Sequence, residues 1–346
     1  MTSLFAPRIF RSQFSFLLVA MSLCCVVRLA AQSPFISISA PDAGSGTNQG
    51  TLATSINQNG AIAGNYTDSN NAEHGFVRAA TGIITEFDAP NLTNTAANGI
   101  NGHGQVVCFG SHTVAGTSHA HGYLRSANGN FIRIDAPGAV DTLVAVINDA
   151  GTAAGTFDDA LHAWHSFLRD ASGNYTIVDA PGAGSEGTFI SGINQNGEVA
   201  GYYADPTGSF HGFVRDQFGN FTAFDVSGST GTVANSINLS GEVTGYSMDN
   251  NGNAHGFVRD ASGTITTFDP SGSFETFANS INDSGTIVGQ WSNGTTFLGF
   301  ERNPAGSIIS FSAAPPDTTS ATAINNRGRI AGYCLNASST AFGFVK

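Results

Sequence analysis

Histidine and aspartate recur along this chain in a pattern that could do acid–base chemistry. Five segments of the type His-Gly-Phe, His-Gly-Tyr or His-Ser-Phe each begin fourteen residues before an aspartate. An imidazole beside a carboxylate can act as a general acid or base. A catalytic set is normally unique, however, whereas a polar residue present once in each repeat usually joins the strands of that repeat. We therefore interpret these histidines as structural: His74, His121, His165, His211 and His255.

Three histidines outside this pattern are the candidate metal ligands. His112 and His119 lie in the loop sequence SHTVAGTSHAHG, and His162 lies in the corresponding loop one repeat later, beside Asp158 and Asp159. Imidazoles on one face of a protein can hold zinc, copper or nickel. No close spacing such as His-x-x-x-His supports such a site. The sequence therefore assigns no metal and no cofactor, and solvated loop histidines are the alternative.

Other catalytic and binding motifs are absent from the sequence. The segments Asp68–Asn71 and Asp249–Asn253 resemble calcium loops, but neither has the Asp-x-Asp-x-Asp-Gly spacing with a closing Glu, so we interpret them as polar turns. No nucleophile elbow, phosphate loop or zinc-protease motif is present. The sequence predicts no catalytic residue.

These residues belong to one motif that is repeated seven times. The dipeptide Ile-Asn occurs in blocks such as SINQNGAIAGNY and GINQNGEVAGYY, at intervals of 43 to 47 residues. Each block precedes a second block that ends in Arg, such as HGFVR, and most units continue to an Asp-containing corner such as TEFDAP. The asparagines of the seven blocks are Asn57, Asn101, Asn148, Asn194, Asn238, Asn282 and Asn325.

Alternation of apolar and polar residues predicts four short strands in each unit. In the first unit we expect them at 51–56, 61–66, 74–78 and 83–89. The Asn-x-x-Gly sequence between the first two strands suits a type I turn in which Asn caps the turn and Gly takes a positive φ. A turn of constant length also joins the third and fourth strands. All length variation therefore falls in the other two connections, on one face of the sheet.

The two ends of the repeat region predict a closed ring. The last unit ends after its third strand, at Lys346, and FISISAP at 35–41 matches the pattern of a fourth strand. Pairing these segments would complete the last unit and remove an exposed edge. Units of about 44 residues suit four-stranded blades. We predict an all-β, seven-bladed β-propeller in a single domain at 32–346, with a right-handed β-helix as the alternative, and we expect a ligand at the channel mouth surrounded by the variable loops.

The first 31 residues have the features of a secretory signal peptide. Arg8 and Arg11 precede an apolar run at 14–27, and small residues follow, with a cleavage position expected near Ala31. The run is too short for a bilayer, which needs about 20 residues. We predict a signal peptide at 1–31 and a secreted or extracellular protein, with the periplasm or the cell surface as alternatives. No integral membrane segment is expected after cleavage.

Composition excludes several classes of protein. With 43 glycines a mostly helical fold is disfavoured, and with 41% hydrophobic residues so is disorder. A formal charge of −12 offers no basic patch for nucleic acid. Cys108 and Cys334 occupy non-equivalent positions, so we expect two buried free thiols, with a disulfide as the alternative.

The combined repeat motif resembles a known family. Ile-Asn-x-x-Gly-x-Val-x-Gly followed by His-Gly-Phe is similar to the HAF repeats, a bacterial extracellular family named for a His-Ala-Phe motif, over about residues 35–346. The resemblance implies a secreted repeat protein with no assigned activity. GIITEFDAP at 82–90 and GTITTFDP at 263–270 are similar to the streptogramin lyases, whose Trp-Phe-Thr-Glu strand motif is absent here.

Two functions remain open from the sequence. Loop variation on one face without a unique catalytic set favours a non-enzymatic, monomeric binding or scaffold propeller for an extracellular ligand, such as a glycan, an envelope component or a protein. The alternative is a propeller enzyme, a lyase or hydrolase similar to the streptogramin lyases, that acts at the channel mouth.

Overall fold

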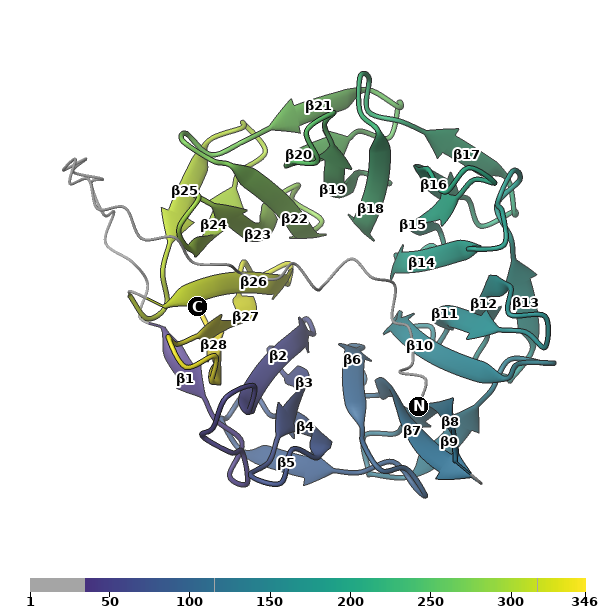
Figure 1. Cartoon of the computed structure of the whole chain (residues 1–346), viewed down its shortest axis with the longest axis vertical. Coiled ribbons are helices and arrows are strands. Elements are labelled where there is room, and N and C mark those ends of the chain that lie inside the picture. The colour runs from purple at the N-terminus through teal and green to yellow at the C-terminus, as the bar shows by residue number, and fades with distance from the viewer. Residues whose placement is uncertain (1–34, 115, 316) are drawn as a thin grey trace.

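The described part of the chain folds entirely from β-strands. The computed structural model describes residues 35–114, 116–315 and 317–346, so the predicted signal peptide at 1–31 lies outside it. No helix within these ranges is long and apolar enough to cross a membrane. The sheets form a ring, and the first strand of each repeat lies nearest the centre (Figure 1). These inner strands are β2 (Gly50–Ile56), β6 (Ala96–Ile100), β10 (Asp141–Ile147), β14 (Thr188–Ile193), β18 (Gly231–Ile237), β22 (Glu275–Ile281) and β26 (Thr318–Ile324).

Three further antiparallel strands follow outward from each inner strand, as the alternation of apolar residues predicts. The second strands are β3 (Ile62–Thr67), β7 (Val106–Val114), β11 (Ala153–Asp158), β15 (Val199–Ala204), β19 (Val243–Met248), β23 (Ile287–Ser292) and β27 (Ile330–Leu335). The third strands are β4 (Glu73–Arg78), β8 (Thr117–Arg125), β12 (Trp164–Arg169), β16 (Phe210–Arg215), β20 (Ala254–Arg259), β24 (Phe297–Arg302) and β28 (Ala341–Val345). The outer strands are β5 (Ile84–Phe87), β9 (Phe131–Ile134), β13 (Tyr175–Val178), β17 (Phe221–Phe224), β21 (Ile265–Phe268), β25 (Ile308–Phe311) and β1 (Ile36–Ile38).

The N-terminal strand completes the last sheet. Within the described residues there are five four-stranded sheets and one eight-stranded sheet, which runs from β26 to β28 and then from β2 to β5, with β1 paired to β28. Only one parallel residue pair, Gly50 with Ala341, joins the two halves of the larger sheet. Strand β1 lies antiparallel to β28, with Ile36 opposite Val345. The predicted pairing of the N-terminal segment with the last strand is confirmed.

The repeat asparagines form a cycle of hydrogen bonds on the face of the tight turns. Asn57 Oδ1 accepts the backbone N–H groups of Asn59 and Ala61, and Gly60 has φ 84°, so the predicted turn is confirmed. Each asparagine side chain also donates from Nδ2 to the backbone carbonyl of the next repeat asparagine, at 2.9 to 3.1 Å. Asn325 donates to the carbonyl of Asn57, which closes the cycle.

The hydrophobic core lies between neighbouring sheets. One cluster combines Ile38 of β1 and Val345 of β28 with Ile56 of β2 and Phe76 of β4, across the two halves of the eight-stranded sheet. Within a sheet the ladder between β2 and β3 shifts register next to Gly64, where an added Cβ would lie 2.1 Å from the Leu52 carbonyl oxygen. Third-strand aromatic rings fill the core and are almost completely buried: Phe76, Phe167, Phe213, Phe257, Phe300 and Phe344.

The repeat arginines close the outer hairpins and also connect sheets. In the hairpin from β20 to β21, Arg259 Nη1 donates to the Asp260 carbonyl at 3.2 Å, which is the predicted position at the turn. The Arg259 guanidinium also lies 5.1 Å from the ring centroid of Phe224 in β17 of the neighbouring sheet. Arg302 contacts Phe268 in the same way, at 4.8 Å. Cation–π contacts of this kind stabilise a pair by about 0.5–2 kcal/mol.

Both described cysteines are buried free thiols, as the sequence predicts. Cys108 lies in β7 and Cys334 in β27, and no disulfide joins them. Burial raises the pKa of Cys108 to about 12 and that of Cys334 to about 11. The thiolate is the reactive form, so both side chains are unreactive in the folded protein.

Candidate functional site

Histidines at the start of the third strands lie between two carboxylates. His74 Nδ1 is 2.8 Å from Asp88, just beyond β5, and Nε2 is 3.8 Å from Asp68, just beyond β3. In three other sheets of the described residues the Nδ1 distance is 2.8 to 2.9 Å and the Nε2 distance 3.5 to 3.6 Å. Each of these arrays connects the second-to-third-strand loop to the end of the outer strand. The three further arrays are Asp159–His165–Asp179, Asp205–His211–Asp225 and Asp249–His255–Asp269.

The loop carboxylates are fixed by the turns that they cap. Asp68 Oδ1 accepts the backbone N–H groups of Asn70 and Ala72, both at 2.8 Å, and Asp249 is held in the same way by Asn251 and Asn253. Hydrogen bonds led by the Asn253 N–H lower the pKa of Asp249 to about 2. The second oxygen of each carboxylate faces the histidine. Both Asp/Asn-rich segments therefore form polar turns, as predicted.

The two carboxylates around His255 change its electrostatics. The hydrogen bond with Asp269 raises the pKa of His255 above its usual value, against the opposing effect of burial, and Asp249 adds to the increase. The corner carboxylate occupies Nδ1 of each imidazole, and a second carboxylate lies 3.5 to 3.8 Å from Nε2. This geometry supports the structural interpretation of the repeated His–Asp pairs.

The β6–β9 sheet has a modified version of the array. His121 Nδ1 is 3.2 Å from Asp135, but Arg133 of β9 also contacts both groups, with Nε 2.5 Å from Asp135 Oδ2. His112 occupies the position of the loop aspartate, and its ring lies 4.8 Å from that of His121. A guanidinium therefore neutralises the carboxylate in this sheet.

The candidate metal ligands do not form one site. The predicted long loop is wrong in part: β7 and β8 continue as a hairpin, in which His112 and His119 are cross-strand partners with ring centroids 6.4 Å apart. His162 lies in the loop of the next sheet and bonds to Asp158 at 2.9 Å, and this hydrogen bond raises the pKa of His162. The described ranges contain no group of three or more His, Cys, Asp or Glu side chains that could hold a metal ion.

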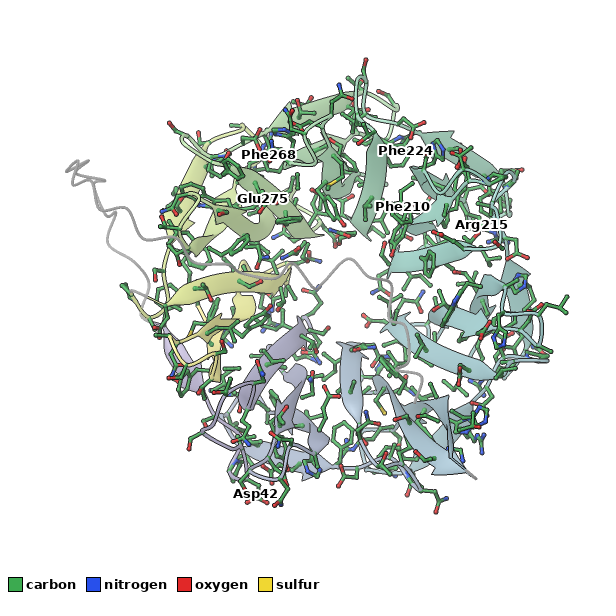
Figure 2. All side chains as sticks on the ribbon, in the orientation of Figure 1. Asp42, Phe210, Arg215, Phe224, Phe268 and Glu275 are labelled. Carbon is green, nitrogen blue, oxygen red and sulfur yellow. The ribbon has the colours of Figure 1, made fainter. Side chains whose placement is uncertain are left out.

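A pocket of about 510 Å³ lies on the loop face, beside the β2–β5 sheet. Asp42 reaches it from the turn after β1, and Figure 2 shows Asp42 at the outer rim of the ring. The Asp42 backbone N–H donates to Glu86 Oε1 at 3.1 Å, which joins two repeats. The sequence places a ligand at the channel mouth, whereas this pocket lies at the rim of the same face. Its main polar lining residues are Asp42, Tyr66, Asp68, His74, Glu86 and Asp88.

Tyr66 forms the inner wall of the pocket. Its side chain is only 4% exposed, and its ring stacks on His74 with centroids 5.0 Å apart. Burial, with smaller contributions from Glu86 and Asp42, raises the pKa of Tyr66. Within the described residues the Tyr66 hydroxyl has no hydrogen-bond partner, so it is available to a ligand in the pocket.

Sequence reasoning missed Asp42, Tyr66 and Glu86, although it includes Asp88 and His74 in a repeated pair. The signal for this pocket is a charge that differs at one position of the outer strands. Glu86 is acidic, whereas Arg133, Ile177, Ala223, Thr267 and Ser310 occupy the same position in other repeats.

No protein-family model and no curated protein matches the chain. Among solved structures it is similar to the β-propeller domain of the Trilobed protease from Pyrococcus furiosus, with TM-score 0.58, 9% identity, and 85% of this chain and 95% of that chain covered. The BP39L lectin from Burkholderia pseudomallei gives TM-score 0.56, 11% identity, and coverage of 86% and 95%. Pyrococcus horikoshii acylaminoacyl peptidase gives TM-score 0.58 and 10% identity, with 86% of this chain and 50% of that chain covered. The likeness shows the β-propeller fold alone.

Proposed function

We propose that this chain is a secreted, non-enzymatic, seven-bladed β-propeller that binds an extracellular glycan. The cycle of seven asparagine hydrogen bonds supports a closed ring of seven blades, in which β1 completes the blade of β26 to β28. The signal-like residues 1–31 and the resemblance to the HAF repeats support export. The acidic composition supports a partner other than nucleic acid.

The polar pocket on the loop face is the observation on which the glycan proposal depends. Its walls present carboxylate oxygens of Asp68 and Asp88, which accept hydrogen bonds, and the Tyr66 hydroxyl, which both donates and accepts. Adjacent sugar hydroxyls need this combination of acceptors and a donor. A predominantly apolar ligand would displace water from the polar lining without replacing its hydrogen bonds, which is unfavourable.

A binding role fits the histidine arrays better than a catalytic one. The nitrogens of His211 face Asp225 and Asp205, and the other three arrays have the same arrangement. The similar fold of a protein named as a lectin is compatible with a glycan ligand. We expect a monomer with no metal or cofactor.

A glycan array combined with a turnover assay tests this proposal. The purified protein is applied to immobilised polysaccharides and oligosaccharides, and bound glycans are then incubated with it and followed by mass spectrometry. We expect binding without cleavage, and weaker binding by Asp88→Asn. Turnover of a sugar or lactone substrate that survives Asp88→Asn would instead support the alternative, a lyase or hydrolase at the channel mouth.

A further inference from the structure

The rim pocket has an excess of negative charge. Four carboxylates line it, from Asp42, Asp68, Glu86 and Asp88, and His74 is the one basic side chain among its lining residues. No lysine or arginine of the described residues lines the pocket. Glu86 and Asp42 are joined through a backbone N–H, which leaves the charge of both carboxylates uncompensated by a cation. An unpaired group of like charges attracts a positively charged ligand.

This charge is specific to one place in the ring. The residue equivalent to Asp42 is a glycine in four other corners, and the residue equivalent to Glu86 is uncharged in four other outer strands. The array of two aspartates around a histidine is repeated, so it does not explain the additional acids. The glycines are Gly138, Gly182, Gly228 and Gly272, and the uncharged outer-strand residues are Ile177, Ala223, Thr267 and Ser310.

We infer that this pocket binds an amino sugar through its protonated amine. An ammonium group donates hydrogen bonds in three directions, so carboxylates on different walls can share it. The sugar hydroxyls would use the remaining carboxylate oxygens and the hydroxyl of the buried Tyr66 side chain, which lines the pocket and has no partner within the described residues. The inference rests on the proposed glycan-binding function and names the class of glycan.

Two other cations fit the pocket less well. A bare metal ion needs several ligand atoms within about 2.0–2.6 Å, and no group of three or more suitable side chains is close enough in the described residues. A lysine side chain has a four-carbon stem that favours apolar walls. The pocket offers only Phe87 and the Tyr66 ring as apolar surface. A hydroxylated ammonium ligand satisfies more of the lining.

Calorimetric titration with two matched oligosaccharides tests the inference. The purified full chain is titrated at low salt with a glucosamine hexamer and with an N-acetylglucosamine hexamer, which differ in the charge of the nitrogen. We expect the glucosamine hexamer to bind at least tenfold more tightly, because acetylation removes the cation. Equal binding of both hexamers would overturn amine recognition and leave the glycan-binding function intact, whereas no binding to any glycan on the array would overturn both.

Matched variants test the location of the site. Glu86→Gln and Asp42→Asn each remove one charge from the pocket, and we expect each to weaken glucosamine-hexamer binding about tenfold, equivalent to about 1.4 kcal/mol. Glu186→Gln makes the same charge change in the exposed loop after β13 and should leave the affinity unchanged. Thermal melts establish that each variant is folded. Unchanged affinity in both pocket variants, or equal binding of hexalysine, would overturn the assignment.

Discussion

Two sheets of the ring have the same histidine array and differ in charge. In the β2–β5 sheet the Tyr66 ring stacks on His74, with centroids 5.0 Å apart, and in the β14–β17 sheet Tyr203 stacks on His211 at 5.1 Å. Both histidines lie between a loop aspartate and a corner aspartate. The shared contacts lie within one repeat, so a repeat that keeps these residues can form them without its neighbours.

The difference lies at two positions outside the repeated frame. The β2–β5 sheet has Glu86 in its outer strand and Asp42 in the corner before it. The β14–β17 sheet has Ala223 and Gly182 at these two positions. Asp42 belongs to the corner that precedes the β2–β5 sheet, so the charged pocket forms only where two repeats meet. The repeated polar residues therefore join the strands of a sheet, whereas residues that vary between repeats give one sheet its additional acidic side chains.

The largest expected effect tests whether the two sheets are equivalent in their cores. Phe76 and Phe213 are fully buried at corresponding positions of β4 and β16. We expect Phe76→Ala and Phe213→Ala each to lower the free energy of unfolding by about 3–5 kcal/mol, because each leaves a cavity. Urea unfolding followed by circular dichroism measures both. A loss in only one variant would mean that the two sheets are packed differently.

The next effect tests the frame on the opposite face, where both sheets contribute to the asparagine cycle. Asn194→Ala removes the bond to the Asn238 carbonyl and leaves the N–H groups of Asn196 and Glu198 without their acceptor. We expect a loss of about 1–3 kcal/mol, because these groups are partly buried. Asn57→Ala should give a similar loss by thermal unfolding. The surface variant Glu186→Gln, whose melting temperature should not change, is the control.

A smaller effect is expected when the acidic residue of the β2–β5 sheet is introduced into the β14–β17 sheet. Ala223→Glu places a carboxylate in β17 at the position of Glu86 in β5. We expect the variant to gain weak binding of the glucosamine hexamer at a second site, with at least tenfold lower affinity than the natural pocket, because Gly182 supplies no second acid. Calorimetry of Glu86→Gln with and without Ala223→Glu detects the new site as additional binding stoichiometry. Ala223→Gln should show no gain.

The smallest effect concerns the pH dependence of the shared histidine array. The pKa of His255 is raised in the folded protein, so its contribution to stability is complete below the unfolded value of about 6.5 and is lost as pH rises through the folded value. Its side chain is 37% exposed, so solvent limits this contribution to less than about 1 kcal/mol. The stability difference between the native protein and His255→Gln should therefore shrink between pH 5.5 and pH 8.5. A stability difference that grows with pH would contradict stabilisation of the protonated His255 by Asp249 and Asp269.

Sequence reasoning predicts the elements that each repeat encodes locally. The alternating pattern gives the strands to within two residues, and Asn57 with Gly60 fixes the turn. The outer strand is shorter than expected, ending at Phe87, because Asp88 leaves the ladder and bonds to His74. These features depend on residues close in sequence or related by one hairpin.

A lengthened hairpin and a pocket formed between two repeats are harder to predict. The SHTVAGTSHAHG segment looks like a loop because it lengthens one repeat, yet its β-branched residues continue the β7–β8 ladder to a turn at Gly116, with φ 87°. The rim pocket needs Asp42 to meet Glu86, and alignment of repeats one beneath another does not place these residues side by side. The repeated motif therefore predicts the scaffold but not the pocket.

The asparagine cycle gives the ring a single rotational sense. Every Nδ2 group donates toward the next repeat, so the circle is homodromic, and successive bonds can polarise one another in the same direction. Each Oδ1 also accepts a backbone N–H of its own turn, so no single amide can flip without losing bonds on both sides. Rotation of the amides cannot reverse this direction, because every acceptor is a backbone carbonyl, which cannot donate. The direction in which the ring is joined therefore follows the direction of the chain, and each repeat is tied to its successor.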